Sequence, residues 1–220
     1  IGNMKAKAIF SISQGEGRNI TTGNDGGFDY TGRVELLPFG SFTSKGDYFG
    51  SDIKREEKPK LSLGLSYDYN DNASRARGNT GSFLSQTRTL STIFADMMFK
   101  YKGFSVMSEY AIKSSDGSSV FIDETDGLEY NFITGSALNI QAGYLLPSHW
   151  ELAARFTSVT PELVEPEYVQ AQNDVSMYTL GISKYIDGHN LKVQSDFSII
   201  IEEGMEESYL VRLQFELSFN

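Results

Sequence analysis

The sequence predicts an all-β protein, and specifically an antiparallel transmembrane β-barrel. Three observations lead to this prediction. In residues 208–220, every second side chain from Tyr209 to Phe219 is apolar, and Arg212 lies between Val211 and Leu213. The same alternation recurs along the whole chain in about ten segments. No run approaches the 18 to 20 apolar residues that a membrane helix needs, so a helical membrane protein is excluded.

The composition agrees with many short strands that are joined by turns. The 220 residues include 12 Tyr, 15 Phe and 21 Gly but only 5 Pro. Hydrophobic residues make up 40% of the chain, a value that is ordinary for a soluble protein, because barrel strands spread their apolar residues by alternation. Cysteine is absent, which excludes disulfides and thiolate metal sites.

Ten strands follow from the alternation, and we treat residues 1–220 as a single barrel domain. In chain order they are expected near residues 4–13, 28–37, 60–69, 93–101, 104–113, 138–144, 150–157, 176–186, 191–201 and 208–220. The clearest hairpin turns at Lys102-Gly103, and Asp187-Gly188 is a second strong turn signal. Lys184 has outward parity near that turn, where a long cationic side chain can reach water.

Connection lengths predict an orientation, because bacterial barrels have short periplasmic turns and longer external loops. The external connections are expected at residues 14–27, 70–90, 114–136, 159–175 and 202–208. The short periplasmic turns are expected at residues 102–103, 147–149 and 187–190. Residues 38–59 also fall on the periplasmic side but are long. Either the flanking strands extend into this segment or it forms a periplasmic platform, and both alternatives stay open.

Several separated motifs resemble one family of porins. They are SISQGEGRN, GRVELLPFGSFTSKGDYFGSDIKREEKPKLSLG, ADMMFKYKGFSVMSEYA, LAARFT and YTLGISKYIDGHNLKVQSDFS. Their order over nearly the whole chain resembles the phosphate-selective porin O/P family. The resemblance implies the C-terminal ten strands of a sixteen-stranded outer-membrane channel, with homotrimeric assembly. The family's main anion-binding elements lie in the other half, so no binding residue is carried over.

Charge is predicted to divide between the inward face and the loops. The whole chain has a formal net charge of −10, whereas the predicted inward face carries nine basic and seven acidic side chains. This small basic surplus predicts mild anion preference at most, because selectivity depends on charge beside the permeation path. The pore-lining candidates are Arg33, Lys60, Lys100, Glu109, Lys113, Arg155, Lys192, Asp196 and Arg212. Arg155 is the strongest individual candidate.

Aromatic residues near the strand ends have outward parity. They fit the two interfacial belts of a membrane protein, and this set comprises Tyr67, Tyr69, Tyr101, Tyr110, Tyr144, Trp150 and Phe219. The acidic runs at residues 123–126 and 202–207 are expected to be solvated loop charge. Divalent cations that bridge to lipopolysaccharide are the less favoured interpretation, because the spacing matches no calcium loop.

These features predict a bacterial outer-membrane porin for small hydrophilic solutes, including anions such as phosphate. Lipid and lipopolysaccharide are the expected surroundings, and a homotrimer or other outer-membrane subunits are the expected partners. No Gly-x-Ser-x-Gly elbow, zinc spacing, dinucleotide fingerprint or basic nucleic-acid patch occurs, so we expect no enzyme, metal, cofactor or nucleic acid. The alternatives are a structural or accessory subunit of an outer-membrane complex, then a ligand-binding or catalytic barrel, and, as a minor structural case, a soluble β-sandwich.

Overall fold

The computed structural model describes residues 3–18, 20, 27–48, 50–162, 173–188 and 190–218. These residues form one ten-stranded antiparallel sheet and one small hairpin. The sheet strands are β1 (Lys5–Gln14), β2 (Phe28–Leu37), β3 (Lys60–Arg75), β4 (Phe83–Tyr101), β5 (Phe104–Ser115), β8 (Gly135–Leu145), β9 (Trp150–Pro161), β10 (Val175–Asp187), β11 (Leu191–Glu202) and β12 (Ser208–Leu217). The hairpin consists of β6 (Val120–Ile122) and β7 (Glu129–Asn131). The predictions of an all-β fold and of ten strands in one antiparallel sheet are confirmed.

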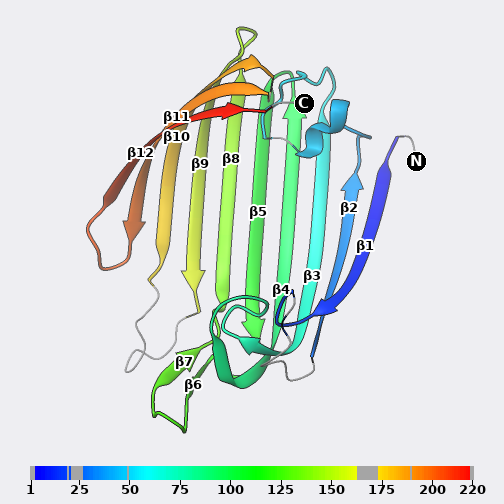
Figure 1. Cartoon of the computed structure of the whole chain (residues 1–220). Coiled ribbons are helices and arrows are strands. Elements are labelled where there is room, and N and C mark those ends of the chain that lie inside the picture. The colour runs from blue at the N-terminus through cyan, green and yellow to red at the C-terminus, as the bar shows by residue number, and fades with distance from the viewer. Residues whose placement is uncertain are drawn as a thin grey trace.

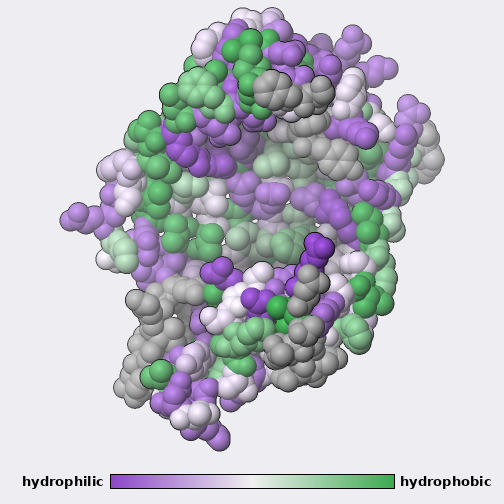
Figure 2. All heavy atoms as spheres, viewed as in Figure 1, coloured by the Kyte–Doolittle hydropathy of each residue, from purple (hydrophilic) through white to green (hydrophobic). Residues whose placement is uncertain are grey.

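The sheet is a meander that curves around a hollow. Each sheet strand pairs with the sheet strands before and after it in the chain, so β1 and β12 form the two edges (Figure 1). We call the face that carries Arg33, Asp96 and Arg155 the inner face. The opposite face, which carries Leu65 and Leu213, is the outer face. Figure 2 looks into the hollow, where hydrophilic and hydrophobic side chains lie side by side.

The turn between β4 and β5 explains why this hairpin was the clearest in the sequence. Tyr101 pairs with Phe104, and the two residues between them, Lys102 and Gly103, have φ angles of 50° and 93°. Positive φ at both central positions defines the type I′ turn, whose twist matches that of the flanking strands. Glycine at the second position adopts this backbone conformation without steric cost.

The predicted connection at residues 70–90 is too long. β3 continues to Arg75 and β4 begins at Phe83, so the loop between them is shorter. The alternation fails here because the register shifts between Asn70 and Ala73, and again between Ala73 and Arg75. A bulge of this kind changes which face the following residues occupy, so a period of two cannot be read through it.

Residues 38–59 fold over the inner face, so of the two alternatives left open by the sequence, the one in which strands extend into this segment is wrong. The segment contains a short 3₁₀ element, η1 (Thr43–Tyr48), which lies in front of the sheet in Figure 1. Lys100, on the inner face of β4, donates hydrogen bonds to the carbonyl oxygens of Gly46 at 2.6 Å and Ser51 at 2.8 Å. Pro38 and Pro59 flank the segment, and proline lacks the N–H group that a strand would use.

The connection between β5 and β8 also folds onto the sheet. Phe121 and Phe132 from this connection pack with Ala73 of β3 and Leu90 of β4, and all four are buried. The backbone N–H of Ile133 donates to the carbonyl oxygen of Ala76 at 2.7 Å. The predicted loop at residues 114–136 therefore contains the β6–β7 hairpin and a small apolar core.

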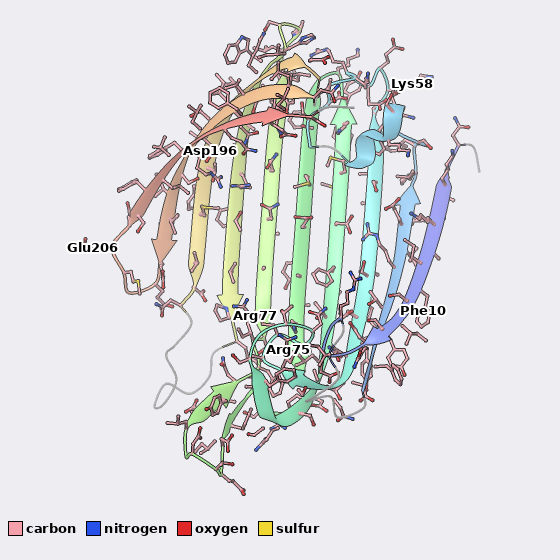
Figure 3. The ribbon with its side chains drawn as sticks, in the orientation of Figure 1. Phe10, Lys58, Arg75, Arg77, Asp196 and Glu206 are labelled. Carbon is pink, nitrogen blue, oxygen red and sulfur yellow. The ribbon has the colours of Figure 1, made fainter. Side chains whose placement is uncertain are left out.

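The outer face is apolar and has no second layer over it in the described part of the chain. Leu65, Ile93, Leu180 and Leu213 are 58%, 44%, 68% and 65% exposed. Phe10 likewise points away from the hollow (Figure 3). A sheet with one apolar face normally buries that face against another element. Among the described residues, no helix is both long and apolar enough to cross a lipid bilayer.

Candidate functional site

The inner face gathers the predicted charged residues from seven of the ten sheet strands. Because side chains alternate along a strand, the pairing register decides which residues share a face. It links Lys60 with Lys100, and Asp96 with Glu109, and these pairs lie side by side. All the charged candidates lie on this inner face, namely Arg33, Lys60, Lys100, Glu109, Lys113, Arg155, Lys192, Asp196 and Arg212.

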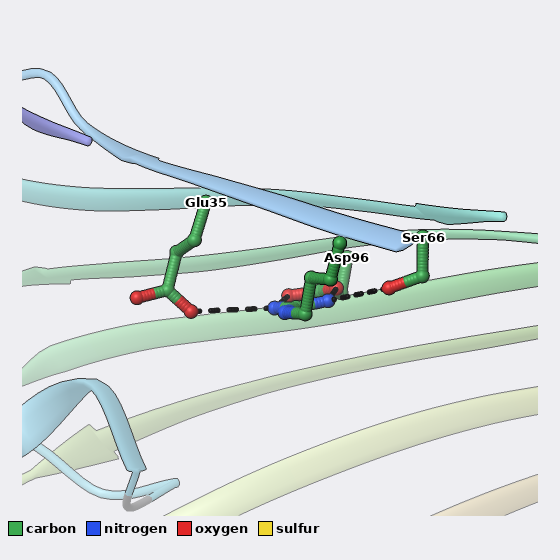
Figure 4. Close-up of polar contacts among 4 residues, drawn as sticks. Glu35, Ser66 and Asp96 are labelled. Carbon is green, nitrogen blue, oxygen red and sulfur yellow. Dashed lines mark hydrogen bonds and ion pairs between the residues drawn. The ribbon is translucent and has the colours of Figure 1, made fainter. Parts of the chain in front are cut away.

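Arg33 is held by two acidic side chains that come from different strands. Its guanidinium donates to the Asp96 carboxylate at 2.5 and 2.9 Å, to Glu35 at 3.4 Å and to the Ser66 hydroxyl at 3.1 Å (Figure 4). Arg33 lies on β2 and Asp96 on β4, so the ion pair crosses over β3. Gly64 on β3 makes this possible, because a Cβ there would overlap both the Asp96 carboxylate and the Arg33 guanidinium.

Two further ion pairs connect β11 to β12. Lys192 lies opposite Glu216, with 2.9 Å between the ammonium nitrogen and the carboxylate oxygen. Asp196 lies opposite Arg212, with 3.0 Å between Nε and the carboxylate oxygen. Each basic side chain thus has an acidic partner directly across the strand pair. These charges balance locally and contribute little net field to the hollow.

Arg155 differs from the other arginines on the inner face. Its Nε atom is buried and has no hydrogen-bond partner within the described ranges. It lies between Gln141 of β8 and Thr179 of β10 in the register. A cavity of about 200 Å³ opens beside it, and Glu151 and Tyr185 also line this cavity. The Tyr185 hydroxyl donates to Glu151 at 2.7 Å, so this carboxylate is bound to Tyr185 and not to Arg155.

The 38–59 segment is anchored at the end of the sheet that carries the β4–β5 and β10–β11 turns. Asp52, which is buried, accepts hydrogen bonds from the backbone N–H of Gly103 at 2.7 Å and of Glu56 at 3.0 and 3.1 Å. Arg55 donates to the carbonyl oxygens of Leu145 and Lys102. A cavity of about 320 Å³ separates the segment from the turn between β10 and β11. The segment therefore covers part of the hollow at this end.

A second charged group lies at the opposite end of the inner face. Asp29, Asp68 and Lys113 line a cavity of about 260 Å³ together with Arg77. The Thr31 hydroxyl donates to Asp68 at 2.8 Å, and the Lys113 ammonium donates to the Arg77 carbonyl oxygen at 2.7 Å. Figure 3 shows Arg75 and Arg77 at this end of the hollow.

Asp29 is an inner-face residue that the sequence reasoning missed. The outward assignment of Tyr30 and Val34 already implies inward parity for Asp29. It lies within the strand predicted near residues 28–37, so reading the alternation over that whole strand identifies it. Glu16, which is fully buried in the structure, had no such signal because it lies in a turn after β1.

The aromatic candidates lie on the outer face, apart from one that lies outside the described residues. Tyr67, Tyr69, Tyr110, Tyr144 and Trp150 are each between 38% and 48% exposed, and Tyr101 is half-buried. Phe219 is the one outside the described residues. Lys184, near the β10–β11 turn, lies with its ammonium 5.3 Å from the centre of the Trp150 ring and donates to the Ser148 carbonyl oxygen at 2.6 Å.

Within the described ranges, no group of three or more His, Cys, Asp or Glu side chains is arranged to hold a metal ion. Among the described residues, the inner face presents ion pairs, Arg155 without a carboxylate bound to it, and several cavities. Comparison of the chain with models of known protein families, with curated proteins and with solved structures found no match.

Proposed function

We propose that this chain forms part of a bacterial outer-membrane porin that passes small hydrophilic solutes through an aqueous barrel lumen. One observation carries the proposal, which is the contrast between the two faces of a single-layer sheet. The outer face is apolar and uncovered, whereas the inner face carries the charged network. Lipid on the outside and water on the inside satisfy both faces at once.

Strand length supports a membrane location. A tilted strand needs about 9 to 11 residues to cross the hydrocarbon core of a bilayer. The ten sheet strands range from 10 residues in β1, β2 and β12 to 19 in β4. The aromatic residues near the strand ends have the outward parity of interfacial belts. Lipid and lipopolysaccharide are the surroundings that the proposal implies.

Closure requires further strands in this proposal. β1 and β12 each have one neighbour in the sheet, and both edges would face hydrocarbon with unpaired backbone groups, which membranes do not tolerate. The resemblance to the phosphate-selective porin O/P family implies sixteen strands and a homotrimer. A sixteen-stranded barrel leaves an aqueous channel, whereas eight strands enclose an interior that side chains fill.

Arg155 is the residue to which we assign anion attraction. Arg33, Lys192 and Arg212 are neutralised by carboxylates, and Lys100 is bound to backbone carbonyls. A guanidinium beside a polar cavity, without a carboxylate bound to it, presents donors to a passing anion such as phosphate. The other charges hold the wall in shape, and we assign no catalytic role to any of them.

A planar-bilayer recording on the full-length protein tests the proposal. We expect open-channel conductance with mild anion preference at most. Arg155→Gln should shift the reversal potential toward cations, even at salt concentrations that screen the loops, because Arg155 borders the path. Arg155→Lys is the matched control, since it keeps the charge. Equal reversal potentials for Arg155→Gln and the parent protein would remove Arg155 from the pathway.

A second candidate function is a structural or accessory subunit of an outer-membrane complex. It is favoured by the two connections that fold over opposite ends of the inner face, residues 38–59 and 116–134. If these connections close the lumen, the protein is a plugged barrel. A correctly folded, full-length sample without conductance would support this second function and contradict the first.

A further inference from the structure

A cavity in the middle of the inner face combines an aromatic ring with a carboxylate. Its volume is about 400 Å³, within the size range of small-molecule sites, and Phe94, Asp96, Glu109, Ala137 and Asn139 line it. Phe94 pairs with Ala111, which in turn pairs with Ala137. These two small neighbours leave the ring uncovered on one side, and Phe94 is 46% exposed although it lies on the polar face.

Glu109 lies close enough to Phe94 to act with it. Glu109 pairs directly with Asp96 and is the diagonal neighbour of Phe94 on the same face. Diagonal positions in an antiparallel pair are about 7 to 8 Å apart, which long side chains can bridge. Glu109 is exposed, and the described residues include no basic side chain in an ion pair with it.

Several of the hydrogen-bond donors around the cavity are already engaged. Asn139 donates one amide hydrogen to Glu109 at 3.3 Å, and Thr157 donates to Asn139 at 3.1 Å. Arg33 is held by Asp96, Glu35 and Ser66. The groups that can still contact a ligand are chiefly the carboxylate oxygens and the face of the aromatic ring. A ligand that supplies positive charge or hydrogen-bond donors therefore suits this cavity better than an anion does.

We propose that Phe94 and Glu109 form a subsite for organic ammonium ions on the wall of the lumen. The ring attracts the cation through its quadrupole, the carboxylate attracts it by charge, and the alanine floor accepts its alkyl groups. This inference deepens the proposed porin function and rests on it for access from solution. In this inference the lumen wall carries two different sites. The Phe94–Glu109 subsite favours alkylammonium ions, and Arg155 favours anions.

Calorimetric titration of the full-length, detergent-solubilised protein with choline chloride tests the subsite. The matched ligand control is 3,3-dimethyl-1-butanol, which has the shape of choline without its charge. We expect choline to bind and the neutral alcohol not to bind. Phe94→Leu and Glu109→Gln should each weaken choline binding by about 3- to 10-fold, the range expected for a partly exposed cation–π contact or ion pair.

Two further variants show whether such losses are specific. Phe99→Leu alters an aromatic residue on the outer face of the same strand, and Glu124→Gln removes an acid at the tip of the β6–β7 hairpin. Neither should change choline affinity. Equal affinity for choline and the neutral alcohol, or unchanged affinity in both Phe94→Leu and Glu109→Gln, would overturn the inference. Conductance without choline binding contradicts the subsite alone, whereas choline binding without conductance contradicts the porin function alone.

Discussion

Lys100 shows how a single buried charge can hold a long connection in place. Its side chain is 2% exposed, and its ammonium group donates to the Gly46 and Ser51 carbonyl oxygens. Lys100→Met should leave both carbonyls without this donor, at a cost of about 1 to 3 kcal/mol. We expect faster amide hydrogen exchange across residues 43–56, measured by mass spectrometry on the folded protein.

Lys60→Met is the control for this prediction. Lys60 pairs with Lys100 across β3 and β4, and its ammonium makes an exposed hydrogen bond to the Phe39 carbonyl oxygen at 3.0 Å. Because water can replace that bond, the exchange of residues 43–56 should hardly change. Similar acceleration in both variants would mean that Lys100 is not the anchor.

Gly64 is the second residue whose role is local and testable. Gly64→Val places a side chain where the Asp96 carboxylate and the Arg33 guanidinium meet. We expect a loss of about 1 to 3 kcal/mol in the free energy of unfolding, measured by urea titration in detergent. Gly32→Val is the matched control, because a Cβ at Gly32 has no heavy atom within 4 Å. Valine favours strands, so Gly32→Val should be neutral or stabilising.

At the scale of the element, β12 tests whether the outer face meets lipid. Leu213 lies in the middle of the strand and Leu217 at its end, and both are exposed. Leu213→Arg should destabilise the full-length protein in lipid vesicles by about 2 to 4 kcal/mol, and Leu217→Arg by at most about 1 kcal/mol. Urea unfolding measures both values. Equal costs at the two positions would argue against a membrane.

The β6–β7 hairpin should respond to acid through Asp123. Hydrogen bonds from the Ser85 hydroxyl and from Thr125 hold the pKa of Asp123 below its usual value of 3.8. The turn is therefore stabilised above that value and loses this stabilisation as the pH falls through the lower folded pKa. Amide exchange at Thr125, corrected for intrinsic rates, should accelerate in acid. Asp123→Asn should abolish this acid dependence, and its persistence in that variant would contradict the assignment.

The strands were predictable from the sequence where a strict period of two holds. β5, β9, β10, β11 and β12 match the alternation to within a few residues. The extensions of β3 and β4 were missed because bulges shift the register at residues 70–75. The inward fold of residues 38–59 was missed because it depends on contacts with distant strands. The gathering of the charged residues on one face could be predicted from their alternation along each strand. The cavity at Phe94 could not, because it depends on the strand register that places Ala111 and Ala137 beside the ring.

At the scale of the whole molecule, charge should act differently in the loop than on the inner face. Glu203, Glu206 and Glu207 lie in and beside the connection between β11 and β12, and Figure 3 places Glu206 there, away from the inner face. Replacing all three with glutamine should raise anion entry at low ionic strength. The effect should fade at 0.1 M salt, where charges are screened within about 10 Å. Reversal potentials measured at two salt concentrations check this prediction. A shift that persists at high salt would place these acids beside the permeation path.

The position of residues 38–59 also has a consequence for the order of folding. Each sheet strand pairs with its neighbours in the chain, so the sheet can grow one hairpin at a time. The segment, in contrast, begins after β2 and rests against Gly103 of the β4–β5 turn and Leu145 at the end of β8, both of which come much later in the chain. The surface that this segment contacts is not complete until β8 has joined the sheet. We therefore expect folding to end with the docking of this segment, as a slow phase that follows strand pairing.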